Sequence, residues 1–206
     1  NEVWRGGRNI SLFLGQYCNW EWVASIALHT PFYCAHIYHP LKNVALNNVF
    51  CALRGNFKSH NLAMADTVRT LINWKREGKI SMVGYISDQV PGYSQIHHFV
   101  DFLNHKDTPV FSGGERMAAL NGGAVSYVRM SCVRRGYYRA QLVRIVGSTE
   151  EAPLHYPVNQ YFKLLEKDIR RAPQYWLWSH NRWKRTKEEY DRIFSEQERK
   201  IRATKA

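Results

Sequence analysis

The fold is decided by Ile10-Ser-Leu-Phe-Leu14, the Gly15 that follows it, and Gln16-Tyr-Cys-Asn-Trp-Glu21. Residues 10–14 are almost all apolar and predict a short buried strand, which Gly15 ends. The aromatic and apolar stretch from Trp20 to Leu28 predicts the helix that follows. A strand, a tight turn and a helix start indicate an α/β protein whose chemistry lies at this turn, because ligands of open α/β sheets bind at the carboxyl ends of strands.

The turn resembles a motif of the bacterial acyltransferases that add a secondary acyl chain to lipid A, members of the wider lysophospholipid acyltransferase superfamily. In that family the motif commonly reads Gly-His-x-x-Asn-Trp-Glu. This sequence matches the glycine, Asn19, Trp20 and the acid Glu21, and it has Gln16 where the family has His. The resemblance implies that position 16 and Glu21 are catalytic and that Asn19 and Trp20 help to bind substrate.

Position 16 decides what chemistry this motif can perform. Moving an acyl group from a thioester to a hydroxyl requires a base, and a carboxylate that orients the base and stabilises its charged form. His suits this task because its pKa lies near neutrality, whereas the amide of Gln does not accept a proton at physiological pH. General base catalysis from Gln16 is therefore absent, a loss of roughly 10²- to 10⁴-fold in rate. On the motif alone, Gln16 and Glu21 are equally well explained as ordinary turn and helix residues.

A second block, Tyr38-His-Pro-Leu-Lys-Asn43, resembles the family's Tyr-Arg-Pro-x-x-Asn. The family's Arg helps to hold the anionic headgroup of the acceptor, and His39 occupies its position. Arg contacts phosphate through two donors at any pH, whereas His offers a single, pH-dependent donor. We expect His39 to contact the headgroup with Lys42 supplying part of the missing charge.

A third block follows a mostly apolar stretch, residues 79–86, that predicts a strand. At its carboxyl end, Ser87-Asp-Gln89 is similar to the family's Pro/Ala-Asp-Gln/His signature. The resemblance implies that Asp88 is a site residue that shapes the acceptor site and that Gln89 binds substrate; the alternative is a solvated carboxylate in a turn. Because strand ends of a parallel sheet meet at one edge, we expect Gln16, Glu21 and Asp88 to share one rim.

Two further segments extend the resemblance. Thr108–Leu120 looks like the family's turn into a helix, whose backbone N–H groups could bind an anion or whose glycines could simply permit the turn. Ala172–Arg185 is very similar to the family's closing signature, in which a Pro, an aromatic cluster and basic residues end the catalytic domain. Its aromatic and basic residues suit a membrane interface, a single nucleic-acid strand, or packing against the sheet.

Composition agrees with a basic protein of one domain spanning residues 1–206. Lys plus Arg is 29 and Asp plus Glu is 17, so the net charge is +12 and favours acidic partners. No apolar run reaches the roughly 18 to 20 residues that span a bilayer. Because the family normally carries a membrane anchor upstream of the first block, we expect the catalytic part of a longer protein that binds the membrane surface. No His or Cys cluster has metal-ligand spacing, so we expect no metal site and no cofactor.

These observations predict a single α/β domain with a mostly parallel, twisted sheet and helices on both faces. The strands are expected at 10–14, 33–38, 80–86, 124–128 and 137–146, and the helices near 20–29, 43–54, 65–77, 113–121 and 158–171, with a further solvated helix over 185–202. The resemblance implies acyl transfer from an acyl carrier protein, or from acyl-CoA, to an anionic lipid A precursor or related lipid at the cytoplasmic face of the bacterial inner membrane. The alternatives are a non-catalytic lipid-binding relative that has lost its base, and a basic nucleic-acid-binding module; with lipid favoured, no nucleic acid is expected as partner.

Overall fold

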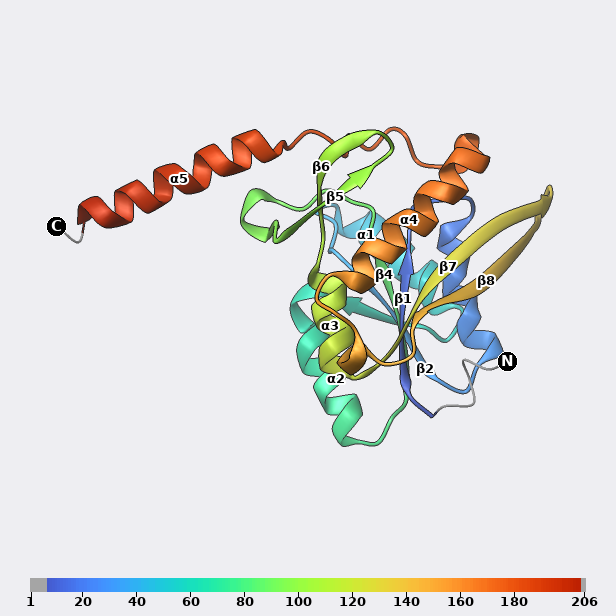
Figure 1. Cartoon of the computed structure of the whole chain (residues 1–206). Helices are drawn as coiled ribbons and strands as arrows, with labels where there is room; N and C mark the ends of the chain where they lie inside the picture. The colour runs from blue at the N-terminus through green and yellow to red at the C-terminus, as the bar shows by residue number, and fades with distance from the viewer. Residues whose placement is uncertain (1–6, 205–206) are drawn as a thin grey trace.

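The computed structural model describes residues 7–204, with side chains described for 7–196. Six strands form one sheet in the order β3-β2-β4-β1-β7-β8. All neighbouring strands run parallel except β8, which returns antiparallel to β7. Figure 1 shows this sheet with its helices, and the predicted α/β class is confirmed. The strands are β1 (Asn9–Leu14), β2 (Tyr33–Tyr38), β3 (His60–Ala63), β4 (Ser81–Ile86), β7 (Gly123–Arg134) and β8 (Tyr137–Val146).

The helices cover both faces of the sheet. The longer ones are η1 (Trp20–His29), which is a 3-10 helix, α1 (Val44–Gly55), α2 (Thr67–Arg76), α3 (Gly113–Asn121), α4 (Tyr156–Arg171) and α5 (Lys187–Thr204). Apolar residues of α2, α3 and α4 pack on one face, around Phe13 of β1. Val23 of η1 packs on the other face, against Leu12 and Leu14 of the same strand. Because β1 is buried on both faces, its sequence is a continuous apolar run rather than an alternating one.

The structure extends the predicted elements in three places. The strand expected at 124–128 is the first part of β7, which forms a twelve-residue strand of the hairpin with β8. β3 pairs with the outer side of β2, and a separate antiparallel pair, β5 (His98–Phe102) and β6 (His105–Val110), lies outside the main sheet. These short strands were not predicted because polar residues interrupt the apolar pattern that identifies strands. Short 3-10 turns, η2 (Met64–Asp66), η3 (Tyr93–Gln95), η4 (Thr149–Glu151) and η5 (Pro173–Tyr175), complete the described elements.

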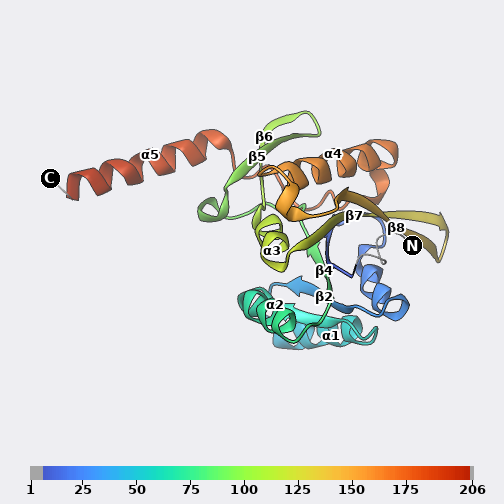
Figure 2. The same ribbon diagram turned by 60° about the horizontal axis from the view of Figure 1, so that its bottom comes forward.

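Two elements reach away from the body of the molecule. The β7–β8 hairpin extends past the sheet, and α5 begins beside the β5–β6 pair and points outward (Figures 1 and 2). The ring of Tyr190 on α5 packs edge-on against Phe99 of β5, with 5.3 Å between the ring centroids. Within residues 7–204, none of the helices combines the length and the apolar character needed to cross a bilayer.

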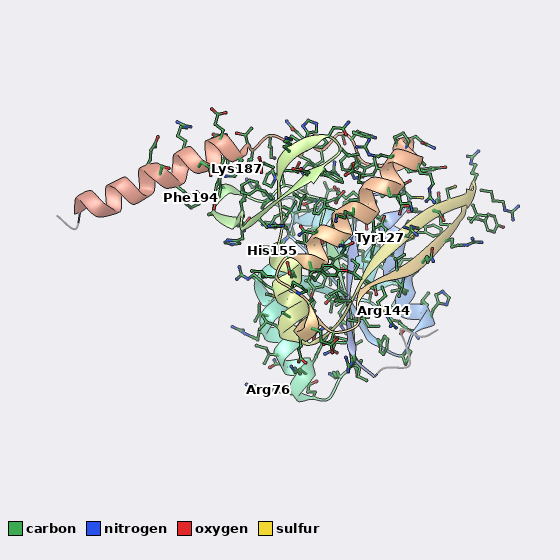
Figure 3. The ribbon with its side chains drawn as sticks, in the orientation of Figure 1. Arg76, Tyr127, Arg144, His155, Lys187 and Phe194 are labelled. Carbon is green, nitrogen blue, oxygen red and sulfur yellow. The ribbon has the colours of Figure 1, made fainter. Side chains whose placement is uncertain are left out.

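A buried polar contact joins α4 to β7. Tyr127, labelled in Figure 3, donates its hydroxyl proton to Asp168 across 2.9 Å. Arg129 of β7 and Arg171 of α4 both pair with the same carboxylate. These contacts hold α4 against the sheet. Residues of α4 pack against Gly15, which begins the turn after β1.

Candidate active site

A cavity of about 920 Å³ lies at the carboxyl ends of β1, β2 and β4. Residues of η1, α1, α2 and α3 complete its wall. Much of the lining is apolar, including Leu14, Val23, Ile26, Ile37, Phe50 and Met82. Its polar lining residues include Gln16, Glu21, His36, His39, Arg54 and Gln89.

Sheet register brings the turn after β1 beside the turn after β4. Leu14 lies opposite Ile86 in the parallel pairing, so the residues two positions further along meet just past the strand ends. The backbone N–H of Gln16 donates to Oδ2 of Asp88 across 3.0 Å. The prediction that positions 16 and 88 come together at one rim is confirmed.

Gly15 leaves room for this turn against α4. A Cβ atom at this position would lie 2.9 Å from Cδ1 of Leu165 and 3.3 Å from the hydroxyl of Tyr161. Both of those residues are fully buried, so neither can easily move aside. The glycine of the motif is therefore required by close packing, which places residue 16 at the cavity wall.

Asp88 lies beneath the cavity rather than in its lining. Its Oδ2 accepts from Nε1 of Trp176 across 2.9 Å and from Nη2 of Arg182 across 2.8 Å, in addition to Gln16 N–H. Nε of Arg182 donates to the backbone carbonyl of Asp88 across 2.7 Å. Asp88 is therefore buried, and the alternative of a solvated carboxylate in a turn is excluded. Its role in shaping the acceptor site stays a prediction, and any such effect would pass through Gln16 or Gln89, which do line the cavity.

The closing segment is tied to the first motif by backbone pairing. Tyr17 and Trp176 form an antiparallel bridge, and N–H of Leu177 donates to the carbonyl of Gln16 across 3.0 Å. Arg182 stacks its guanidinium 3.9 Å from the ring centroid of Trp176. Trp176 and Arg182 are buried, which excludes the membrane-interface alternative for these two residues, whereas Trp178 remains half exposed. The segment therefore packs against the core of the sheet, except at the exposed rings of Tyr175 and Trp178.

Glu21 has a different partner from the one expected. Its two carboxylate oxygens accept from Nε and Nη2 of Arg54 on α1, across 2.9 Å and 2.7 Å. Among the described residues no hydrogen bond joins Glu21 to Gln16, although both line the cavity. The bidentate pair fixes the Arg54 guanidinium at the cavity wall. An orienting role of Glu21 toward residue 16 stays a prediction.

The other predicted site residues divide between the cavity and the outer surface. Trp20, His39 and Gln89 line the cavity, and His39 is exposed at its opening. Asn19 precedes η1 and is half-buried, and Lys42 is exposed beside the start of α1 without forming part of the lining. The headgroup contact expected of His39 therefore has a suitable location, whereas Lys42 could reach a ligand only outside the cavity.

Two basic residues of this region, Arg54 and Arg182, were not identified as site residues from the sequence. Arg54 stands in the last turn of α1, 33 residues from Glu21, and no spacing rule links such positions. Arg182 belongs to the closing segment, whose basic residues the sequence distinguishes only as a group. Its burial beside Asp88, 94 residues away, has no signal in the local sequence.

The comparison with known families supports the resemblance found in the sequence motifs. The model of the bacterial lipid A biosynthesis acyltransferase family matches residues 1–185. The chain belongs to this family. The match covers the sheet, the cavity and the closing segment, and it ends just before α5 of this acyltransferase family member. No curated protein matches the sequence.

Proposed function

We propose that this member of the lipid A acyltransferase family binds a fatty acyl group in the cavity and acts in its transfer from an acyl carrier protein, or from acyl-CoA, to a hydroxyl of a lipid A precursor or related lipid. The observation that carries the proposal is the apolar cavity that opens beside Gln16 at the carboxyl ends of the strands. Its volume lies at the upper end of the roughly 300–1,000 Å³ typical of small-molecule sites.

An acyl chain is the ligand that the lining favours. Leu14, Val23 and Met82 present apolar surface from both the sheet and η1. Each methylene group moved from water into such surroundings contributes about 0.8 kcal/mol, so ten methylene groups contribute about 8 kcal/mol before the costs of binding. A polar sugar or nucleotide would gain nothing comparable from these walls.

An anionic headgroup is the acceptor feature that the basic lining residues favour. Arg54 is held at the cavity wall by Glu21, and Arg116 of α3 and the exposed His39 also line the cavity. A guanidinium fixed by a carboxylate keeps its orientation while its remaining N–H donors face a ligand. This arrangement supports a phosphate-bearing lipid as the acceptor, with Arg54 supplying the contact that His39 alone would make weakly.

Gln16 favours a second candidate function. The side chain at this position accepts a hydrogen bond from Arg182 across 3.4 Å, and it has no group that could remove a proton from an acceptor hydroxyl. A relative that binds an acylated lipid without transferring its chain would keep the cavity and the Glu21–Arg54 pair while lacking this base. The two candidates make different predictions for a restored His.

Peripheral association with the cytoplasmic face of the inner membrane is part of the proposal. α1 directs Asn47, Phe50, Cys51 and Arg54 to the cavity, and no residue of α1 is buried. On its other side Leu46, Val49 and Leu53 are each more than half exposed. A cavity wall with an apolar outer side supports contact with lipid, and the net charge of +12 supports attraction to anionic headgroups.

The test is the Gln16→His variant. The buried Arg182 guanidinium would lie beside the new imidazole and disfavour its charged form, so the imidazole would be available as a base at neutral pH. Transfer from an acyl carrier protein thioester to a lipid A precursor should rise by about 10²-fold or more and should fall at low pH as the imidazole becomes charged. Gln16→Asn is the matched control, because it changes the side chain without adding a base.

Two further variants separate the outcomes. Glu21→Ala in the Gln16→His background should remove most of the gain if Glu21 supports the base, directly or through Arg54. If the Gln16→His protein is folded and still inactive, adding His39→Arg distinguishes weak acceptor binding from loss of the chemistry. Background transfer from the double variant as well would contradict the acyltransferase proposal and favour the lipid-binding relative.

A further inference from the structure

A second cluster of catalytic residue types lies in the wall of the same cavity, on the edge formed by β2 and β3. His36 near the end of β2 has Ser59 and Asn61 on the two sides of its ring. Nδ1 of His36 lies 3.1 Å from Oγ of Ser59, and Nε2 is hydrogen-bonded to Oδ1 of Asn61. His36 and Ser59 both line the cavity, together with Glu21 and Arg54.

The hydrogen bonds determine which ring nitrogen carries the proton. Nδ2 of Asn61 donates to the backbone carbonyl of Cys51 across 2.9 Å, which turns Oδ1 of the amide toward His36. Because Oδ1 only accepts, Nε2 of His36 must be the protonated nitrogen. Nδ1 then carries the lone pair, and the hydroxyl of Ser59 donates to it.

We propose that Ser59, His36 and Asn61 form a nucleophile, base and orienting group that accept an acyl chain onto Ser59. This arrangement has the roles of a Ser-His-Asp triad with Asn as the third member, and it is recognised by geometry rather than by sequence order. In the usual triad Nε2 faces the serine and Nδ1 faces the acid, whereas here Nδ1 faces Ser59 and Nε2 faces Asn61. The lone pair that accepts the proton is still directed at the serine. The inference rests on the proposed function only for the identity of the acyl donor.

The chemical step balances without a metal or a redox partner. Oγ of Ser59 attacks the thioester carbonyl, and its proton passes to Nδ1 of His36. The carbon–sulfur bond breaks, and the leaving thiolate takes that proton, so the products are an ester on Ser59 and a free thiol. A lipid hydroxyl or water then attacks the ester carbonyl and gives its proton to Nδ1 of His36. The bond between the acyl carbon and Oγ breaks, and Nδ1 returns that proton to Oγ, so the products are an acylated lipid or a free fatty acid and the original Ser59.

The surroundings of His36 suit this task. Burial lowers the pKa of His36, and the Asn61 hydrogen bond acts in the opposite direction, so the imidazole is neutral and able to accept a proton near pH 7. The charge of Arg54 also lowers the pKa of His36, and the charge of Glu21 raises it. Once His36 is protonated, the nearby Glu21 carboxylate stabilises the cation.

This cluster also supplies what position 16 lacks. Gln16 offers no base, whereas His36 offers one inside the same cavity, on the face of the sheet that Cys34 and η1 share. An activated serine would allow the chain to take up an acyl group while the motif after β1 stays without its His.

The experiment uses a fluorophosphonate, which reacts with activated serines, and p-nitrophenyl dodecanoate as an acyl donor, both with the full chain. We expect a single adduct, located on Ser59 by peptide mass spectrometry, and a burst of p-nitrophenol. Ser59→Ala should abolish both, and His36→Gln should slow labelling by about 10²-fold or more. Ser94→Ala, an exposed serine outside the cavity, is the matched control and should keep the adduct.

Asn61 is a positioning residue and needs a separate readout. Asn61→Asp replaces the neutral acceptor by a carboxylate that favours the charged imidazole, so the acid limb of the labelling rate should move to higher pH. A merely structural role would leave that limb in place. Thermal unfolding of each variant establishes that it is folded.

The outcomes separate this inference from the proposed function, because neither probe contains a carrier protein or a lipid acceptor. No adduct on Ser59 in the folded protein, or equal labelling of the His36→Gln variant, overturns the inference and leaves lipid acyl transfer to its own test. An adduct on Ser59 that depends on His36, without transfer to any lipid A precursor, supports the inference and contradicts the proposed acceptor.

Discussion

Replacing Arg182 by Met should strongly destabilise the protein, because it leaves a buried charge without its partner. The side chains of Arg182 and Asp88 are 3 % and 0 % exposed, and their ion pair is 2.8 Å long. After the change, Oδ2 of Asp88 would keep only the N–H groups of Gln16 and Trp176. Breaking a buried pair in this way costs about 3–5 kcal/mol, a large part of the roughly 5–15 kcal/mol that stabilises a typical domain.

Urea unfolding followed by far-ultraviolet circular dichroism measures this loss. In thermal unfolding of a chain of this length, the same loss of about 3–5 kcal/mol corresponds to a fall of roughly 6–20 °C in Tm. Arg170→Met is the matched control, because Arg170 pairs with Glu166 on the exposed side of α4 and should cost at most about 1 kcal/mol.

A double variant tests the cause of the loss. Asp88→Asn together with Arg182→Met removes both charges, so the pair of changes should cost less than Arg182→Met alone. The reasoning is refuted if Arg182→Met costs less than about 1 kcal/mol, or if neutralising Asp88 as well brings no recovery.

Three further results are expected. Gly123→Ala should destabilise the protein by about 1–3 kcal/mol or more in urea unfolding, since its Cβ would overlap the backbone carbonyl of Asn9. A Cβ at Gly113 would meet nothing within 4 Å, so Gly113→Ala serves as the control, and equal stability of the two variants would contradict this packing argument. Burial lowers the pKa of His36 below its ordinary 6.5, so the unfolded chain binds more protons, the free energy of unfolding should fall as pH drops below about 6.5, and His36→Gln should flatten that dependence in a pH series of urea titrations. Binding to vesicles in a sedimentation assay should rise with anionic lipid and fall with salt, and Leu53→Glu on α1 should weaken it whereas Leu154→Glu, exposed but distant from α1 in sequence, should not; binding that ignores both lipid charge and Leu53 would exclude this surface.

The sequence by itself was sufficient for five of the six strands of the main sheet and for the meeting of its first and third motifs. The apolar run of β1 and the apolar stretch before Asp88 identify buried strands, because both faces of a central parallel strand contact helices. Once two such strands are neighbours in a parallel sheet, their carboxyl ends lie at one edge. The proximity of Gln16 and Asp88 therefore follows from local patterns and one general rule of topology.

Only the tertiary structure decided which side chains pair across that edge. Glu21 pairs with Arg54 rather than with residue 16, Asp88 pairs with a buried Arg182, and Ser59, just before β3, meets His36 of β2. Each pairing joins residues that are far apart in the sequence, separated by 33, 94 and 23 positions. Hydrophobic periodicity records which face of a strand or helix is buried, whereas the partner of a buried charge depends on how whole elements pack, and no local pattern of residues carries that information.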